Sequence, residues 1–324
     1  MPPAESELSA LDKIAFLFPG QGSQRVGMGL DLLRRWPGLT EKYYRRADEV
    51  LGFELSRLCW QGPAQELRQM PVTQPAVVLT SVVAHEVLHA HGVVPDIVAG
   101  HSLGEFSALV CAGVLDWVDA LRLVRLRGEL MMAANQRVPG KMAAVVGLDL
   151  ATVEEMCAKA AAASGEVVEV ANHNDFTQVV VSGQTAAVDA LAGLVWQAGA
   201  DRVVMLEIGG AAHCTLLGGV EDEFAAALED VEFRDPVIPV VSSFSAAPVA
   251  SGADARDCLL RQFTGRVNWT GTALRLAAEG AGRLVEVGPG KVLGGLCRRI
   301  TPGVTAYRTD SEEQTALTLA GLAG

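Results

Sequence analysis

The residues best suited to chemistry form the run Gly100-His101-Ser102-Leu103-Gly104, which fits the pattern G-x-S-x-G. A strand-like apolar run precedes the motif and a helix-like run follows it, which is the context that the motif needs. The two glycines permit a strained turn that lifts the serine hydroxyl away from the backbone. The helix N-terminus and the backbone N–H of Leu103 would then face an oxyanion formed by attack on a carbonyl. The pattern predicts Ser102 as a nucleophile, with a purely structural glycine turn as the alternative.

A serine nucleophile needs a base, and the chain has six histidines. His101 is the neighbour of the serine, but its side chain should point away from the direction in which Ser102 projects. His173 lies in a segment that we expect to be an insertion. His213 follows that segment, where the chain should return to the main domain, so it is the favoured base. The alternative is a histidine that only satisfies hydrogen bonds in a loop.

A second motif could bind zinc, because residues 85–89 read His-Glu-Val-Leu-His and match H-E-x-x-H. On a helix, His85 and His89 would share one face, with Glu86 beside them. His91 is too close in sequence to act as the usual distant third ligand, and no extended motif follows. We therefore expect a surface helix that leads into the strand before Ser102, and no metal site.

The elements that must position these residues alternate between strand and helix, which predicts an α/β fold with a doubly wound parallel sheet. The expected elements are a strand at 14–18, a helix within 26–35, a loop containing 73–76, a helix to about 91, the strand–turn–helix around Ser102, strands at 237–243 and 283–288, and an exposed loop at 245–254. The strands are short apolar runs bounded by turn signals.

The middle of the chain has a different order. Strands are expected at 141–148, 166–172, 177–183 and 201–208, with helices at 151–163 and 186–199. This βαββαβ order is the ferredoxin-like pattern. We therefore expect a ferredoxin-like subdomain at 139–208, inserted between two parts of the main domain at 13–138 and 209–324. The polar, acidic residues 1–12 are expected to be a disordered tail.

Composition restricts the possible partners. No run of eighteen apolar residues and no signal peptide is present, which predicts a cytoplasmic protein without a membrane span. The net charge of −12 argues against nucleic acid as a partner. A local basic patch could still attract an acidic protein. Its candidates are Arg122, Arg125, Lys291, Arg298 and Arg299, although ordinary solvated surface is the favoured interpretation for each of them. The six cysteines lack a CxxC pair and should be free, mostly buried thiols.

Several long motifs lie in order along the chain. They are FPGQGSQRVGMG (18–29), QGPAQEL (61–67), TQPA (73–76), GHSLGEFSALVCAG (100–113), HCTLL from residue 213, and EVGPGKVLGGL (286–296). Together they closely resemble the malonyl-CoA:acyl carrier protein transacylases of fatty acid synthesis and the related acyltransferases of polyketide synthases. The resemblance covers about residues 13 to 310, and it implies an α/β-hydrolase-like core that carries a ferredoxin-like insertion.

The resemblance also implies roles for single residues. Ser102 matches the nucleophile that becomes acylated, and His213 matches its general base. Gln21 matches the glutamine whose backbone N–H, with that of Leu103, forms the oxyanion hole. 

Two further matches concern the substrate and the base. Arg127 matches the arginine that pairs with the free carboxylate of malonate, where a guanidinium can donate two parallel hydrogen bonds. Gln262 matches the residue whose main-chain carbonyl holds the histidine, which explains why no triad aspartate is obvious.

Two stretches depart from the family pattern. Asp175-Phe176 stands where the family usually has Ser-Pro, and Ala211-Ala212 precedes His213 where a serine or an aromatic residue is often found. The alanines could widen the acyl site for a branched or larger group, or they could be neutral changes that are compensated elsewhere.

The resemblance implies a ping-pong transfer of a malonyl group from malonyl-CoA to the phosphopantetheine thiol of an acyl carrier protein. It implies a monomer and no metal or redox cofactor. The alternatives are a trans-acting polyketide acyltransferase with a different or larger acyl group, an acyl-editing hydrolase, a non-catalytic docking module and a zinc protease. The residues do not separate fatty acid synthesis from polyketide synthesis.

Overall fold

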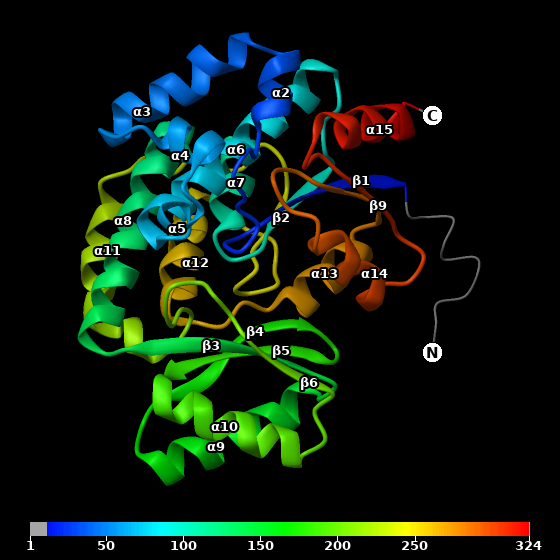
Figure 1. Cartoon of the computed structure of the whole chain (residues 1–324). Coiled ribbons are helices and arrows are strands. Elements are labelled where there is room, and N and C mark those ends of the chain that lie inside the picture. The colour runs from blue at the N-terminus through cyan, green and yellow to red at the C-terminus, as the bar shows by residue number, and fades with distance from the viewer. Residues whose placement is uncertain (1–11, 324) are drawn as a thin grey trace.

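Short strands of apolar residues build the main sheet in the computed structural model, which describes residues 12–323 (Figure 1). The strands are β1 (Lys13–Phe18), β2 (Ile97–Gly100), β7 (Val240–Val241), β8 (Ala281–Glu286) and β9 (Thr305–Arg308). They pair in the order β7-β2-β1-β8-β9, and every pair is parallel. The expectation of a parallel α/β sheet is therefore confirmed.

Helices cover both faces of this sheet. Successive side chains of β1 point to opposite sides and are apolar on both, so each face needs a layer to pack against. Phe16 and Phe18 belong to a core cluster with helices such as α6 and α7, whereas Ala15 and Leu17 belong to another with α13 and α14. The helical segments are α2 (Leu30–Arg35), η1 (Thr40–Arg45), α3 (Arg46–Leu51), α4 (Leu55–Gln61), α5 (Ala64–Leu67), α6 (Met70–Ala90), α7 (Gly104–Cys111), α8 (Trp117–Arg137), η2 (Thr215–Val220), α11 (Glu221–Glu229), α12 (Gly252–Thr264), α13 (Trp269–Ala278), α14 (Leu293–Ile300) and α15 (Glu312–Leu322).

Helix α6 corrects one expectation and refines another. Residues 73–76 are not a loop, because the helix runs through them with Pro75 inside it. Pro75 has no N–H for the carbonyl of Pro71, but the Arg125 guanidinium donates a hydrogen bond to that oxygen at 3.0 Å. The surface helix expected around residues 85–89 is only the last part of α6: Glu86 is partly exposed and His89 is exposed, whereas the preceding turns of the helix are buried.

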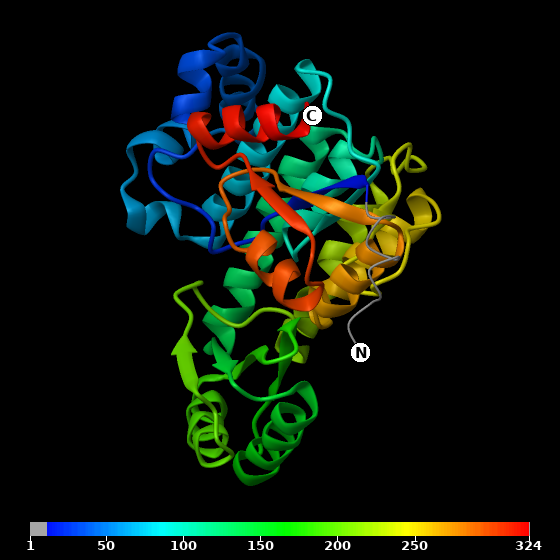
Figure 2. The same cartoon turned by 90° about the vertical axis from the view of Figure 1, so that its right-hand side faces the viewer.

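A second sheet forms from the middle of the chain. The elements follow in the order β3 (Gly140–Val146), α9 (Leu150–Ser164), β4 (Val168–Asp175), β5 (Gln178–Gln184), α10 (Thr185–Gln197) and β6 (Arg202–Met205). The strands are antiparallel and ordered β4-β5-β3-β6. Figures 1 and 2 show this sheet and its two helices as a layer at one end of the molecule.

The two faces of the second sheet have different partners. Ala143 and Val145 pack with α9 and α10 in a separate small core. Met142, Ala144 and Val180 point the other way and join the core of the main body. The second sheet therefore supplies one wall of the space between the two parts.

Other expectations have mixed outcomes. The strand expected at 237–243 is reduced to β7, and β9 was not anticipated. All six cysteines are buried free thiols, as expected. No helix within residues 12–323 is long and apolar enough to cross a membrane. The tail expected at 1–12 lies, apart from Asp12, outside the described residues.

Candidate active site

Ser102 lies on the sharp turn between β2 and α7, with a positive φ of 53° that L-residues rarely adopt. Gly100 and Gly104 must be glycines because other backbone atoms lie too close to leave room for a Cβ. A Cβ on Gly100 would lie 2.0 Å from the carbonyl carbon of Gly104, and a Cβ on Gly104 would lie 2.0 Å from the oxygen of Phe18. The turn is therefore held against the end of β1.

His213 meets Ser102 although the two are 111 residues apart, with Ser102 Oγ 2.5 Å from His213 Nε2. His213 also has a positive φ, of 57°, in the segment that follows the second sheet. Its Nδ1 lies 2.8 Å from the main-chain oxygen of Gln262. That acceptor requires a proton on Nδ1, so Nε2 is left free to accept the serine proton.

Burial sets the charge of the histidine. It lowers the pKa of His213 to about 3, and the positive charge of Arg127 acts in the same direction. The imidazole is therefore neutral near pH 7 and able to take a proton. His101 does not compete for the serine, because its Nε2 lies 2.9 Å from Asn174 Oδ1.

Gln21 and Leu103, the residues expected to form an oxyanion hole, lie on the two turns that follow β1 and β2. Gln21 follows the end of β1 and lines the same cavity as Ser102 and His213. Its side chain donates a hydrogen bond to the oxygen of Ile208 at 2.7 Å, which fixes the turn. Neither the backbone N–H of Gln21 nor that of Leu103 donates a hydrogen bond to another residue within 12–323.

Arg127 is a buried cation on α8, with 2% of its surface exposed. Its Nη1 donates a hydrogen bond to Gln74 Oε1 at 3.0 Å, whereas its buried Nη2 has no partner among the described residues. Burial lowers the pKa of Arg127 to about 10, so it still carries its charge near pH 7. A buried charged donor without an acceptor destabilises the fold. An anionic group bound in the cavity would supply the acceptor that Nη2 lacks.

Gln74 is a functional candidate that the sequence reasoning missed. It lies in the TQPA run, which we expected to be a loop, and the packing of α6 against α8 brings it to Arg127. Its Nε2 also lies 3.5 Å from Gln21 Oε1. Gln74 therefore connects the expected oxyanion turn with the arginine.

Both parts of the chain line the cavity, which has a volume of about 630 Å³. The Ser102 turn, Gln21 and Arg127 come from the main body, and Met142 and Ala144 come from the second sheet. Of the two alanines before His213, only Ala212 lines the cavity. The backbone of Ala211 is instead held by the Asn135 side chain through two hydrogen bonds.

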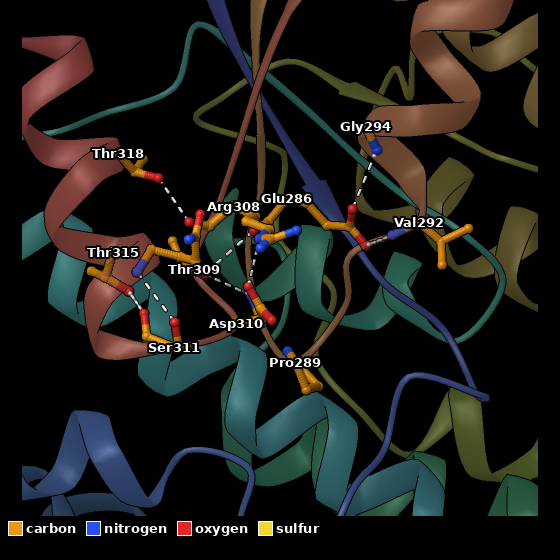
Figure 3. A network of polar contacts seen from close by, with 12 residues as sticks. Glu286, Pro289, Val292, Gly294, Arg308, Thr309, Asp310, Ser311, Thr315 and Thr318 are labelled. Carbon is orange, nitrogen blue, oxygen red and sulfur yellow. Dashed lines mark hydrogen bonds and ion pairs between the residues drawn. The ribbon is translucent and has the colours of Figure 1, made fainter.

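The buried carboxylate of Glu286 holds the segment 289–293, which forms another wall of the cavity. Glu286 ends β8 and accepts hydrogen bonds from the N–H groups of Val292 and Gly294 at 3.0 and 3.2 Å, at the N-terminus of α14 (Figure 3). Burial raises the pKa of Glu286 to about 6. These contacts fix the segment 289–293, which lines the cavity.

Three of the five candidate residues for a basic patch are paired with acids. Arg299 donates a hydrogen bond from Nε to the buried carboxylate of Asp175 at 2.7 Å, which ties the second sheet to α14. Arg122 and Arg125 contact Asp119 and Glu129 on their own helix. Asp175, which departs from the family pattern, thus has a structural contact.

The side chains of the H-E-x-x-H motif make other contacts. Glu86 pairs with Lys42 at 2.5 Å, and burial lowers the pKa of His85 to about 4. Throughout the described part of the chain, no group of three or more His, Cys, Asp or Glu side chains is arranged to hold a metal ion.

Comparisons with known proteins agree on one family. The model of the acyl transferase domain matches residues 15–294. The malonyl CoA-acyl carrier protein transacylase of Escherichia coli K12 is 41% identical over 310 residues, which are 95% of this chain and 99% of that protein. A crystal structure of an acyl carrier protein S-malonyltransferase from Vibrio cholerae has a TM-score of 0.89 at 40% identity, covering 94% of this chain and 99% of that one. A chain from the structure of a type II polyketide synthase acyl carrier protein in complex with its malonyl-transacylase has a TM-score of 0.91 at 38% identity. The match covers 96% of this chain and 100% of that chain.

Proposed function

We propose, since the chain belongs to the acyl transferase family, that it transfers a malonyl group from malonyl-CoA to the phosphopantetheine thiol of an acyl carrier protein. The observation that carries this proposal is the 2.5 Å contact between Ser102 and His213 in a cavity that also holds the buried, half-paired Arg127. A nucleophile, its base and a carboxylate receptor are the groups that such a transfer needs.

The first half-reaction loads the serine. His213 Nε2 takes the proton of Ser102 as the oxygen attacks the thioester carbonyl, and the N–H groups of Gln21 and Leu103 stabilise the oxyanion. The carbon–sulfur bond then breaks, and the imidazolium returns its proton to the departing coenzyme A thiolate. The product is a malonyl ester on Ser102.

The second half-reaction reverses these roles. The carrier's thiol gives its proton to His213 and attacks the ester, and Ser102 leaves with that proton. Side chains, backbone N–H groups and two thiols complete this ping-pong cycle, so the proposed chemistry calls for no metal or redox cofactor.

Arg127 would select the acyl group. The free carboxylate of malonyl-CoA would accept a hydrogen bond from the unpartnered Nη2, while Gln74 keeps the guanidinium oriented through Nη1. Acetyl-CoA has no such group and would leave the buried charge unpaired.

We also infer the domain organisation. Residues 139–208 form a ferredoxin-like subdomain inserted into an α/β-hydrolase-like core made of 13–138 and 209–324. The order β3-α9-β4-β5-α10-β6 and the antiparallel pairing β4-β5-β3-β6 support this division.

Intact mass spectrometry tests the proposal. The protein is incubated with malonyl-, methylmalonyl- or acetyl-CoA, alone and then with a holo acyl carrier protein. We expect one malonyl adduct on Ser102, no adduct in Ser102→Ala, and transfer of the adduct to the carrier.

Other outcomes would change the assignment. Preferential loading of methylmalonyl-CoA would indicate a larger acyl substrate, for which Ala212 leaves room beside the cavity. Release of free malonate faster than transfer to the carrier would indicate a hydrolase. A protein that takes no acyl group from any of the three thioesters would overturn the proposal.

A further inference from the structure

A buried carboxylate lies close to the catalytic pair without touching it. Glu105 is on α7, three residues after Ser102, and only 1% of its surface is exposed. Burial raises the pKa of this carboxyl, and hydrogen bonds from its neighbours oppose that effect. The mechanism described above does not use Glu105.

The contacts of Glu105 form a closed triangle with Ser243 and Gln262. Its Oε2 accepts hydrogen bonds from the N–H of Ser243 at 3.0 Å, from Ser243 Oγ at 2.7 Å and from Gln262 Nε2 at 2.6 Å. The third side is a hydrogen bond from Gln262 Nε2 to Ser243 Oγ at 3.2 Å. Both N–H donors of the Gln262 amide therefore point to fixed acceptors.

Gln262 is also the residue whose backbone contacts the base. Its main-chain oxygen lies 2.8 Å from His213 Nδ1. Helix α12 ends at Thr264, so this carbonyl is one of the last four, which have no N–H partner within the helix. The negative end of the helix dipole also favours the positive charge that the imidazole acquires when it takes the serine proton.

We propose, building on the function proposed above, that Glu105 is a positioning residue in the structural place of a triad acid. It holds the Gln262 side chain, and thereby keeps the Gln262 carbonyl on His213 Nδ1. Helix α7, which follows Ser102, thus also orients His213, because Glu105 acts through Gln262. A neutral carbonyl then does what an aspartate does in other serine enzymes, because it fixes the imidazole tautomer and ring direction.

The test compares three variants of the full chain. Glu105→Leu fills a similar volume but leaves the donors of Ser243 and Gln262 unpaired. Glu105→Gln retains an acceptor oxygen for them. Ser107→Ala is the matched control, because Ser107 is also buried on α7 and its Oγ has no partner among the described residues.

Two measurements are made on each variant. The first is the single-turnover rate of acyl-enzyme formation at saturating malonyl-CoA, together with the concentration that half-saturates it. The second is the NMR resonance of the His213 Nδ1 proton in protein labelled with ¹⁵N-histidine, which reports the hydrogen bond to Gln262 without any substrate.

For Glu105→Leu we expect the single-turnover rate to fall by about 100-fold, the loss typical of a catalytic group displaced by an ångström. Half-saturation by malonyl-CoA should change much less than the rate, since Arg127 loses no hydrogen bond and feels only the removed charge of Glu105. The Nδ1 proton signal should shift or broaden. Glu105→Gln should recover most of the rate and the signal, and Ser107→Ala should change neither. If Glu105→Leu does not fold, Ser243→Ala replaces it, because that variant removes the hydroxyl that contacts both Glu105 and Gln262.

The outcomes separate this proposal from the function itself. If the wild type forms the acyl-enzyme and Glu105→Leu matches it in both rate and Nδ1 signal, the positioning role is wrong while the proposed function stands. If the wild type forms no acyl-enzyme, the function is wrong, and the Nδ1 signal alone decides whether Glu105 orients His213.

Discussion

Replacing Arg127 with methionine should separate the binding of substrate from the stability of the fold. Methionine keeps an unbranched apolar chain in the space of the arginine but removes both guanidinium donors. In the unliganded protein, Nη1 contacts Gln74, whereas Nη2 is buried without a partner among the described residues. Only a ligand with an acceptor group would use the second donor.

The magnitude follows from that arrangement. In Arg127→Met, the malonyl carboxylate would be buried without its cation, which costs about 3–5 kcal/mol. This corresponds to a loss of about a hundredfold or more in kcat/KM for malonyl-CoA. Acetyl-CoA loses no contact, so its kcat/KM should stay the same or rise, and the preference for malonyl-CoA should largely disappear.

Stability should respond in the opposite direction. Burial lowers the pKa of Arg127 from 12.5 to about 10, a difference that corresponds to about 3 kcal/mol of lost solvation. Methionine removes that cost but leaves Gln74 Oε1 without its donor, which costs about 1–3 kcal/mol. The free energy of unfolding of Arg127→Met should therefore be unchanged or higher.

The assay measures release of coenzyme A from each acyl-CoA and unfolding in urea. Arg122→Met is the matched control, because Arg122 lies on the same helix with an exposed side chain and should affect neither. Equal malonyl preference in Arg127→Met and Arg122→Met would refute the assignment of Arg127 as carboxylate receptor. A strongly destabilised Arg127→Met would refute the view that its second donor awaits a ligand.

Three more predictions concern pH, the cavity wall and the catalytic turn. Because burial lowers the pKa of His213 to about 3, the rate of acyl-enzyme formation should show no loss between pH 8 and pH 5 from a titration near 6.5. The unfolded state gains the histidine proton below about pH 6.5, so the free energy of unfolding should fall from there towards pH 3, with a smaller decrease in His213→Gln. Glu286→Gln replaces one acceptor oxygen with a donor beside the N–H groups at the start of α14. The free energy of unfolding in urea should fall by about 1–3 kcal/mol. The KM for malonyl-CoA should rise, because segment 289–293 loses contacts that hold it in place. Gly104→Ala would place a Cβ 2.0 Å from the Phe18 oxygen and should prevent folding. The control is Gly193→Ala on α10, where no atom lies within 4 Å of the added Cβ; it should raise the melting temperature. Normal folding of Gly104→Ala would contradict the close approach.

One error of the sequence reasoning has a clear physical cause. Pro75 suggested a loop because proline removes an N–H from a helix, but the distant Arg125 satisfies the carbonyl that proline leaves free. A long-range contact thus overrode a correct local signal. The H-E-x-x-H segment was expected to be a surface helix because it leads into the strand before Ser102; it reaches solvent, but as the end of a helix whose preceding turns are packed in the core.

Other residues gave no signal that local spacing could read. Gln74, Glu105 and Glu286 stand inside longer motifs, and nothing in their local spacing distinguishes them from their neighbours. Gln74 and Glu105 contact partners distant in the chain, Arg127 and Gln262. Glu286 instead contacts the start of α14, a few residues further along the chain. A buried carboxylate and an exposed one look alike in a sequence, so only the packing could identify these three.

The sequence by itself determined what depends on neighbouring residues. The strained turn follows from Gly100, Ser102 and Gly104, and the two kinds of sheet follow from the periodicity and order of apolar runs. Tertiary structure alone decided which distant groups meet: the 2.5 Å contact between Ser102 and His213, and the arginine donor left without an acceptor among the described residues. The reason is that hydrogen bonds and burial act over a few ångströms in space, whereas spacing along the chain constrains only residues that share a turn, a helix or a strand.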